Sequence, residues 1–90
     1  MADISVKKPS KDDLKRLGVD SWGLWEKEES EFPYSYGEKE TCYILEGEAE
    51  VSSKDGKKAS FKAGDLVVFP VGLDCTWKIK KKIRKRYLFG

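Results

Sequence analysis

The sequence has no histidine, only two cysteines and no long apolar run. A zinc site would therefore need carboxylates and thiolates alone, although the usual zinc set includes histidine or further cysteine. Two cysteines are too few for a disulfide framework, so we expect free thiols. No apolar run is long enough to cross a bilayer, so we expect a soluble protein without membrane contact.

The remaining composition is that of one small domain, residues 1–90. A chain of this length buries roughly 60 to 65% of its unfolded surface on folding. The N-terminal stretch MADISVKKPSKDD has no apolar segment like that of a secretory signal. Together with free thiols, this predicts a cytoplasmic protein. Import into a plastid or another organelle stays open, because a transit peptide can be missing from the sequence.

Charge is unevenly distributed, although the net charge is only +2. Residues 1–56 carry 8 basic and 14 acidic side chains, whereas residues 57–90 carry 10 and 2, so we expect the two parts to attract each other. The run KIKKKIRKR, residues 78–86, is compatible with nucleic-acid binding, because clustered cations bind phosphates. Since no recognition motif accompanies it, we interpret it as a hairpin with solvated cations and expect no nucleic-acid partner. The expected acidic partners are Glu46, Glu48 and Glu50.

One short helix is predicted near the start, and strands after it. Ser10 supplies an N-cap, Asp13 completes a capping box and Gly18 ends the helix. From residue 21 onward short strands alternate with turn signals such as Asp55-Gly56, which predicts an all-β sandwich or closed barrel. The expected strands cover residues 21–28, 31–37, 40–47, 48–61, 65–70, 75–80 and 83–89.

Alternation along these strands predicts which side chains point inward. In ETCYILEG both faces are apolar, which indicates a central strand with Glu40 on one face. In EGEAEV the three glutamates face outward and the small apolar residues inward. In RKRYLF, Lys85 shares the apolar face with Tyr87 and Phe89. We therefore predict that Lys85 enters the interior and meets Glu40, either as a site for a polar small molecule or as an internal salt bridge.

Two stretches, ETCYILEG and GDLVVFPVGLDC, resemble the two motifs of the cupins. The first cupin motif has two histidines one residue apart, a glutamate three or four residues later and a glycine after six more; Glu40 and Gly47 have this spacing. Gly64, Pro70 and Gly72 match each step of the second motif. The resemblance implies an RmlC-like jelly-roll β-barrel with one short helix.

Every motif histidine is replaced in this chain. The first two histidine positions fall on Tyr34 and Tyr36, and the third falls on Cys75. Glu28 stands at the position of the opening glycine and Ile79 at that of the asparagine. Since these histidines are the metal ligands of the family, we expect no metal and no cofactor here.

A narrower resemblance rests on W-x-x-W-E, KETCYILEG, GDLVVFPxG, CTW and R-K-x-Y. These stretches look like single-domain cupins related to ethanolamine-utilisation Q-type proteins and to the cupin halves of ureidoglycine aminohydrolase. The aminohydrolase is a two-cupin enzyme with a manganese site. This chain has one cupin and no histidine, so we do not expect that reaction.

The first functional hypothesis is a metal-independent pocket for a small molecule. Glu40 and Lys85 are candidates for acid-base catalysis or charge recognition, or alternatively form a structural ion pair. The other candidates are either ligand contacts or, alternatively, packing residues and an inert buried thiol. These candidate ligand-binding residues are Tyr34, Tyr36, Cys75, Trp77 and Tyr87.

Two other hypotheses stay open. The chain is alternatively a non-catalytic binding or scaffold protein that forms a homodimer, with the same residues as packing. A cavity containing Glu40 favours the pocket, and an interior filled by aromatic side chains favours the scaffold. The third hypothesis is nucleic-acid binding through residues 78–86, which a strong salt dependence of binding would support. A zinc site made of Glu40, Cys42 and Cys75 is a separate alternative, and it lacks a usual fourth ligand.

Overall fold

The structure is a computed structural model and describes residues 4–90. All seven strands pair antiparallel in one sheet, in the order β1-β6-β4-β7-β2, while β3 pairs with β7 and β5 with β4. The strands are β1 (Ser5–Lys7), β2 (Gly23–Lys27), β3 (Ser30–Ser35), β4 (Glu40–Ser53), β5 (Lys58–Lys62), β6 (Leu66–Phe69) and β7 (Asp74–Phe89). The all-β prediction is confirmed.

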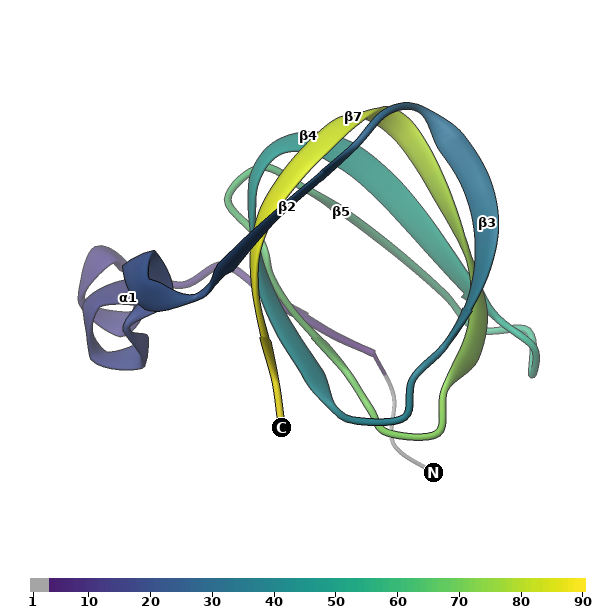
Figure 1. The fold of residues 1–90 in the computed structure, drawn as a ribbon, viewed down its shortest axis with the longest axis horizontal. Coiled ribbons are helices and arrows are strands. Elements are labelled where there is room, and N and C mark those ends of the chain that lie inside the picture. The colour runs from purple at the N-terminus through teal and green to yellow at the C-terminus, as the bar shows by residue number, and fades with distance from the viewer. Residues whose placement is uncertain (1–3) are drawn as a thin grey trace.

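The sheet coils around an interior, and the helix lies outside the ring of strands (Figure 1). Within residues 4–90 the strand pairings do not join the two ends of the sheet, so the predicted barrel is not closed by hydrogen bonds. None of the helices described is long and apolar enough to span a membrane.

The predicted helix is confirmed as α1 (Lys11–Leu17). The Ser10 hydroxyl accepts from the Asp13 backbone N–H, and the Asp13 carboxylate accepts from the Ser10 backbone N–H. These two bonds satisfy donors that a helix N-terminus leaves unpaired. Gly18 ends α1 in a left-handed conformation, and a short 3-10 helix, η1 (Val19–Ser21), leads into β2. Sequence patterns missed η1 and the three-residue strand β1.

The predicted hairpin within residues 78–86 is wrong, because β7 is one strand of 16 residues. The long strand β4 pairs along one side of β7. On its other side, β3 pairs with residues 74–79 and β2 with residues 83–87. The lysine cluster therefore marks the point where β7 changes neighbours, and not a turn.

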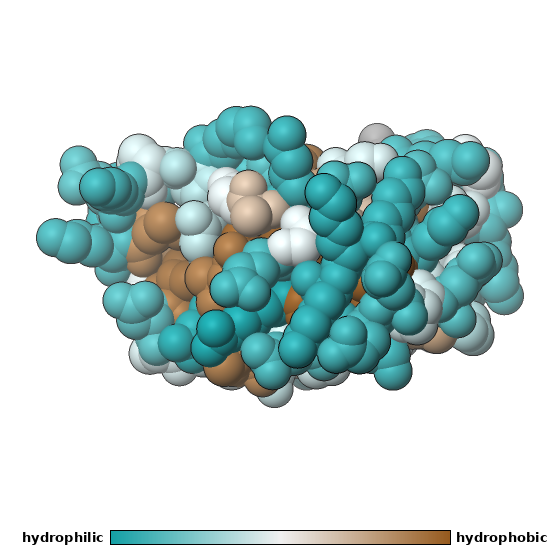
Figure 2. All heavy atoms as spheres, turned by 90° about the horizontal axis from the view of Figure 1, so that it is seen from above, coloured by the Kyte–Doolittle hydropathy of each residue, from teal (hydrophilic) through white to brown (hydrophobic). Residues whose placement is uncertain are grey.

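The cations of β7 lie among acidic side chains of its neighbours. Arg84 lies between Glu46 of β4 and Glu26 of β2, and its Nε is 3.3 Å from the Glu26 carboxylate. Of the other predicted partners, Glu48 lies opposite Lys81. The Glu50 carboxylate lies 3.9 Å from Lys80 Nζ. Figure 2 shows a mostly hydrophilic face on this side of the molecule. Cross-strand charges of opposite sign thus lie side by side, as the charge distribution predicted.

The set of β4 residues that points inward changes at a bulge. Cys42 and Ile44 are buried near its start, whereas Ala49 and Val51 are buried further along, so the inward positions change from even to odd. The register against β7 shifts between Ile44 and Ala49, as a bulge requires. Gly47 sits within this shift with a φ of 93°. The predicted inward residues on both sides of the bulge are confirmed.

Candidate functional site

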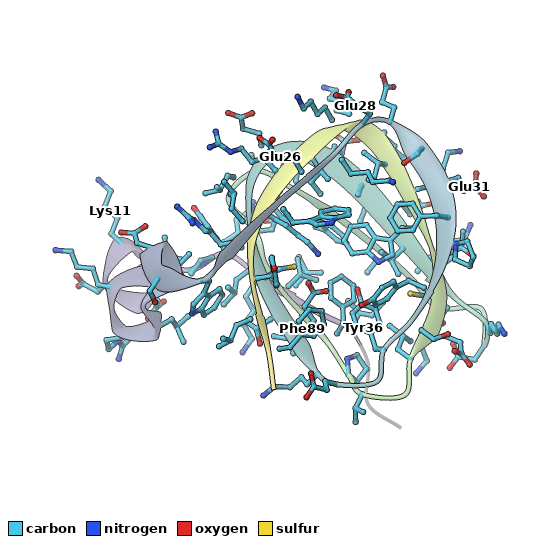
Figure 3. All side chains as sticks on the ribbon, viewed as in Figure 1. Lys11, Glu26, Glu28, Glu31, Tyr36 and Phe89 are labelled. Carbon is cyan, nitrogen blue, oxygen red and sulfur yellow. The ribbon has the colours of Figure 1, made fainter. Side chains whose placement is uncertain are left out.

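A cavity of about 230 Å³ opens into the interior of the coiled sheet. Seven of its nine lining residues are aromatic, and the other two are Glu40 and Lys85. Figure 3 shows Tyr36 and Phe89 inside the ring of strands, whereas Glu28 and Glu31 lie outside it. The aromatic lining residues are Trp25, Phe32, Tyr34, Tyr36, Trp77, Tyr87 and Phe89.

A larger groove of about 510 Å³ lies between the β4–β5 turn and the β6–β7 connection. It contains none of the predicted site residues, and its charged lining residues, such as Lys54, Asp55 and Asp74, are exposed. Solvent-exposed charges discriminate ligands weakly because water screens them. We therefore place the candidate site in the smaller cavity, where the charged groups are buried.

Glu40 and Lys85 form a buried ion pair in the cavity wall. Lys85 Nζ donates to Glu40 Oε2 at 2.9 Å, and the two side chains are only 6% and 4% exposed. The lysine stem comes from β7 and the carboxylate from the first residue of β4. The predicted meeting of these two residues is what the structure shows, and the pair adds no net charge to the cavity.

Two indole rings hold the ammonium group of Lys85. Its Nζ lies 4.8 Å from the centre of the Trp25 ring and 4.7 Å from that of Trp77. Trp25 of β2 is the direct cross-strand partner of Lys85, which explains its position. Cation–π attraction is strongest when the cation is desolvated, as it is here. A carboxylate and two ring faces together surround this lysine.

Tyr36 links the aromatic wall to the ion pair. Trp77 Nε1 donates to the Tyr36 hydroxyl at 3.1 Å. Burial raises the pKa of Tyr36 above its usual range, and the neighbouring Glu40 carboxylate raises it further. The phenol is therefore neutral at physiological pH and keeps a proton that it can donate.

The aromatic side chains hold one another in fixed orientations. The rings of Phe32 and Trp77 are stacked, with an interplanar angle of 7° and centroids 6.1 Å apart. Trp25 meets both of these rings edge to face. Tyr34 packs edge-on against Tyr36 with centroids 4.6 Å apart. Such ring contacts favour particular orientations and add stability beyond that from buried area alone. The cavity walls are therefore largely preformed.

Most of the predicted site residues are brought together at this cavity, with two qualifications. Tyr34 is 40% exposed and stands at the rim. Cys75 is buried but does not line the cavity, and its thiol donates to the Tyr34 carbonyl at 3.4 Å. Burial raises the pKa of Cys75 to about 11, which makes its thiol a poor nucleophile at neutral pH.

Sequence reasoning missed three of the lining residues. Phe32 lies two residues before Tyr34 in β3 and therefore points to the same face of the strand, so the sequence alternation could have identified it. Phe89 lies on the predicted apolar face of Lys85. Trp25 lies in the predicted strand 21–28, and only the pairing of β2 with β7 brings it over the ammonium group.

The side chains do not fit the metal that the cupin motifs imply. In residues 4–90, no three His, Cys, Asp or Glu side chains lie together as a metal site requires. This finding contradicts the zinc hypothesis for Glu40, Cys42 and Cys75. Burial raises the pKa of Cys42 to about 12, and the Cys75 thiol and Tyr36 phenol are also protonated at neutral pH. Protonated donors bind divalent metals poorly, and one carboxylate remains.

Restoring the three histidines is expected to create a metal site. The triple variant Tyr34→His, Tyr36→His and Cys75→His adds neutral nitrogen donors beside Glu40, and imidazole suits nickel and other divalent ions. We expect about one metal ion per chain in this variant by elemental analysis and none in the wild type. A stoichiometric metal in the wild-type protein would contradict the expectation of a metal-free site. A triple variant that takes up no metal would contradict this assignment of the ligand positions.

Comparisons with known proteins identify the family. The sequence model of the EutQ-like cupin domain matches residues 14–87. A DUF861-family protein from Thermotoga maritima is 49% identical with a TM-score of 0.96, and the match covers 98% of this chain and 100% of that chain. No curated protein matches the chain.

Two more distant structures share the fold. The EutQ protein of Clostridium difficile is 22% identical with a TM-score of 0.69, and the match covers 96% of this chain but 66% of that one, just under two thirds. A putative ethanolamine utilization protein Q from Salmonella typhimurium is also 22% identical, with a TM-score of 0.68 and coverage of 98% and 69%. The resemblance to the aminohydrolase stays a prediction. The cupin resemblance and its fold are confirmed, and the chain belongs to the family of EutQ-like cupin domains.

Proposed function

We propose that this protein binds a small molecule in the aromatic cavity without using a metal. The observation that supports this proposal is the buried Glu40–Lys85 pair in the wall of a preformed cavity. Ligand sites are typically concave and mostly apolar, with a few fixed polar groups that orient the ligand. This cavity has that composition.

The ligand has a flat body and one polar group. Its body would lie against the rings of Trp77, Phe32 and their neighbours, because aromatic faces and edges attract planar molecules. Its polar group would meet the Tyr36 hydroxyl or the ion pair. The volume of about 230 Å³ is below the roughly 300 Å³ at which pockets for drug-sized ligands begin, so the ligand is small.

The ligand is not a cation. The ammonium group of Lys85 already occupies the position between Trp25, Trp77 and Glu40 that attracts positive charge. A second cation there would meet like-charge repulsion at low dielectric. The name of the Salmonella typhimurium neighbour refers to ethanolamine utilization, and the amine of ethanolamine is positively charged at neutral pH. We expect ethanolamine to leave this cavity empty.

Three probes with the same ring and different charges test the proposal. Benzyl alcohol is expected to bind with a Kd on the order of 1 mM, as suits so few atoms. Benzylammonium, which adds a positive charge, is expected not to bind. Benzoate shows how a negative charge on the probe changes its affinity. Binding is followed by NMR through the three tryptophan indole N–H signals.

The chain provides its own control for this titration. Trp25 and Trp77 line the cavity, whereas Trp22 is buried outside its lining. Only the first two indole signals should shift, with assignments made through Trp22→Phe. If no probe shifts these signals up to its solubility, the pocket proposal is wrong, and the scaffold alternative with its expected homodimer becomes the better hypothesis.

A further inference from the structure

We infer that Gly23 sets the width of the cavity by leaving room for the ring of Tyr87. This inference rests on the proposed function, because it makes Gly23 a specificity-determining residue for the ligand. Tyr87 lines the cavity, whereas Gly23 is outside its lining. The glycine therefore acts through the tyrosine and not by contact with the ligand.

The ring of Tyr87 lies directly over the Gly23 backbone. A β-carbon built on Gly23 would be 2.5 Å from Tyr87 Cζ, 2.6 Å from Cε2 and 2.8 Å from the hydroxyl oxygen. All three distances are too short for a real contact, so any side chain at Gly23 forces the ring to move. Gly23 has no positive φ, so the ring, and not backbone conformation, requires glycine here.

The strand register explains why the ring can reach the glycine. Gly23 of β2 and Tyr87 of β7 are direct cross-strand partners, and such partners project to the same face of a sheet. On its other side Tyr87 is opposite Cys42 of β4, whose side chain is fully buried. The tyrosine ring therefore leans toward β2, where the absent side chain leaves space.

Inside the fold, a Tyr87 ring displaced from Gly23 has one direction with free volume. The next pair on the same face of this ladder is Trp25 with Lys85, and both line the cavity. Cys42 blocks the β4 side. A methyl group on Gly23 therefore pushes the Tyr87 ring toward Lys85, into the space that the ligand would occupy. The expected consequence is a narrower cavity.

An aromatic ring that covers a cross-strand glycine can also serve stability alone. The two roles differ in what they predict. A stabilising role affects the unfolding midpoint and leaves ligand preference unchanged. If Gly23 sets the cavity width, the dependence of affinity on ligand size changes. A side chain at position 23 should disfavour larger ligands, and removal of the Tyr87 ring should favour them.

Gly23→Ala and Gly37→Ala form a matched pair for the test. A β-carbon on Gly37 would have nothing within 4 Å, and no positive φ constrains it. In the Gly23→Ala protein without probe, we expect shifted Trp25 and Trp77 indole signals and, in a crystal structure, a Tyr87 ring moved into the cavity. Benzyl alcohol should bind about tenfold more weakly, equivalent to roughly 1.4 kcal/mol. Gly37→Ala should match the wild type in each measurement.

Two further variants complete the test. Gly23→Ala combined with Tyr87→Leu removes the displaced ring and should restore benzyl alcohol binding. Tyr87→Leu alone should favour 2-naphthalenemethanol, a larger probe, and it keeps the inference testable if Gly23→Ala does not fold. Unchanged benzyl alcohol affinity in Gly23→Ala would overturn the inference. An unchanged probe preference in Tyr87→Leu, or a Tyr87 ring that turns outward to solvent in Gly23→Ala, would overturn it as well.

The probe-free measurements separate this inference from the proposed function. If the wild type binds no probe while the Gly23→Ala crystal structure shows Tyr87 in the cavity, the proposed function fails and the role in specificity fails with it. If the wild type binds benzyl alcohol and Gly23→Ala binds it equally well, only the role of Gly23 is overturned.

Discussion

Replacing Lys85 with methionine is expected to destabilise the protein by about 3 to 5 kcal/mol, because it leaves the Glu40 carboxylate buried without its cation. The Glu40 side chain is only 4% exposed, and its Oε2 receives the 2.9 Å hydrogen bond from Lys85. Methionine retains the apolar stem and loses both the charge and the donor. Urea unfolding measures the loss directly.

The same substitution on the outer face of β7 is the control. Lys82 is 58% exposed and lies 3.5 Å from a Glu28 carboxylate that is 78% exposed. Exposed pairs contribute about 0 to 1 kcal/mol, so Lys82→Met should cost little. Equal losses in Lys82→Met and Lys85→Met would show that the buried pair has no special role.

A double variant separates the charge from the packing. Glu40→Leu combined with Lys85→Met removes both charges from the cavity wall, and apolar replacement of a whole buried pair is often neutral or stabilising. We expect this protein to be more stable than Lys85→Met alone, although it lacks one more native side chain. If the double variant is the less stable of the two, packing and not charge dominates at this site.

The inward meeting of Glu40 with Lys85 was predictable because apolar and polar residues alternate clearly in the few residues around each of them. Alternation in ETCYILEG and alternation in RKRYLF each predicted an inward-facing charged side chain, and both side chains lie in the wall of one cavity. Tyr36 and Trp77, two of the predicted ligand-binding residues, also line this cavity. Local patterns determine which face a residue occupies, and in a small all-β domain there is only one interior.

The continuity of β7 was not predictable in the same way. Residues 80–82 are all lysine, and a run of exposed cations resembles a turn when it is seen alone. These lysines stay in the strand because β4 supplies paired backbone and acidic side chains along it. Such support comes from residues distant in sequence. The role of Trp25 escaped prediction for the same reason, since it depends on the register between β2 and β7.

The two motif glycines illustrate this limit most clearly. In sequence, Gly47 and Gly72 are equivalent, and each marks a fixed position of a cupin motif. In the structure both have a positive φ, of 93° and 83°. A β-carbon on Gly72 would have nothing within 4 Å. A β-carbon on Gly47 would overlap the Lys82 carbonyl oxygen and lie 2.8 Å from the Cα of Ile83.

Gly47→Ala is therefore expected to destabilise the protein far more than Gly72→Ala. Gly72→Ala adds only the strain of a left-handed conformation, about 1 to 2 kcal/mol. Gly47→Ala adds a clash with the backbone of β7, which cannot rotate away as a side chain can, for a total of roughly 3 to 5 kcal/mol. Urea unfolding of both variants, with Gly37→Ala as the unstrained reference, gives the comparison. Similar losses at Gly47 and Gly72 would mean that the β4 bulge does not hold β7 as closely as the structure shows. A much larger loss at Gly47 would identify close backbone approach as the reason for glycine there.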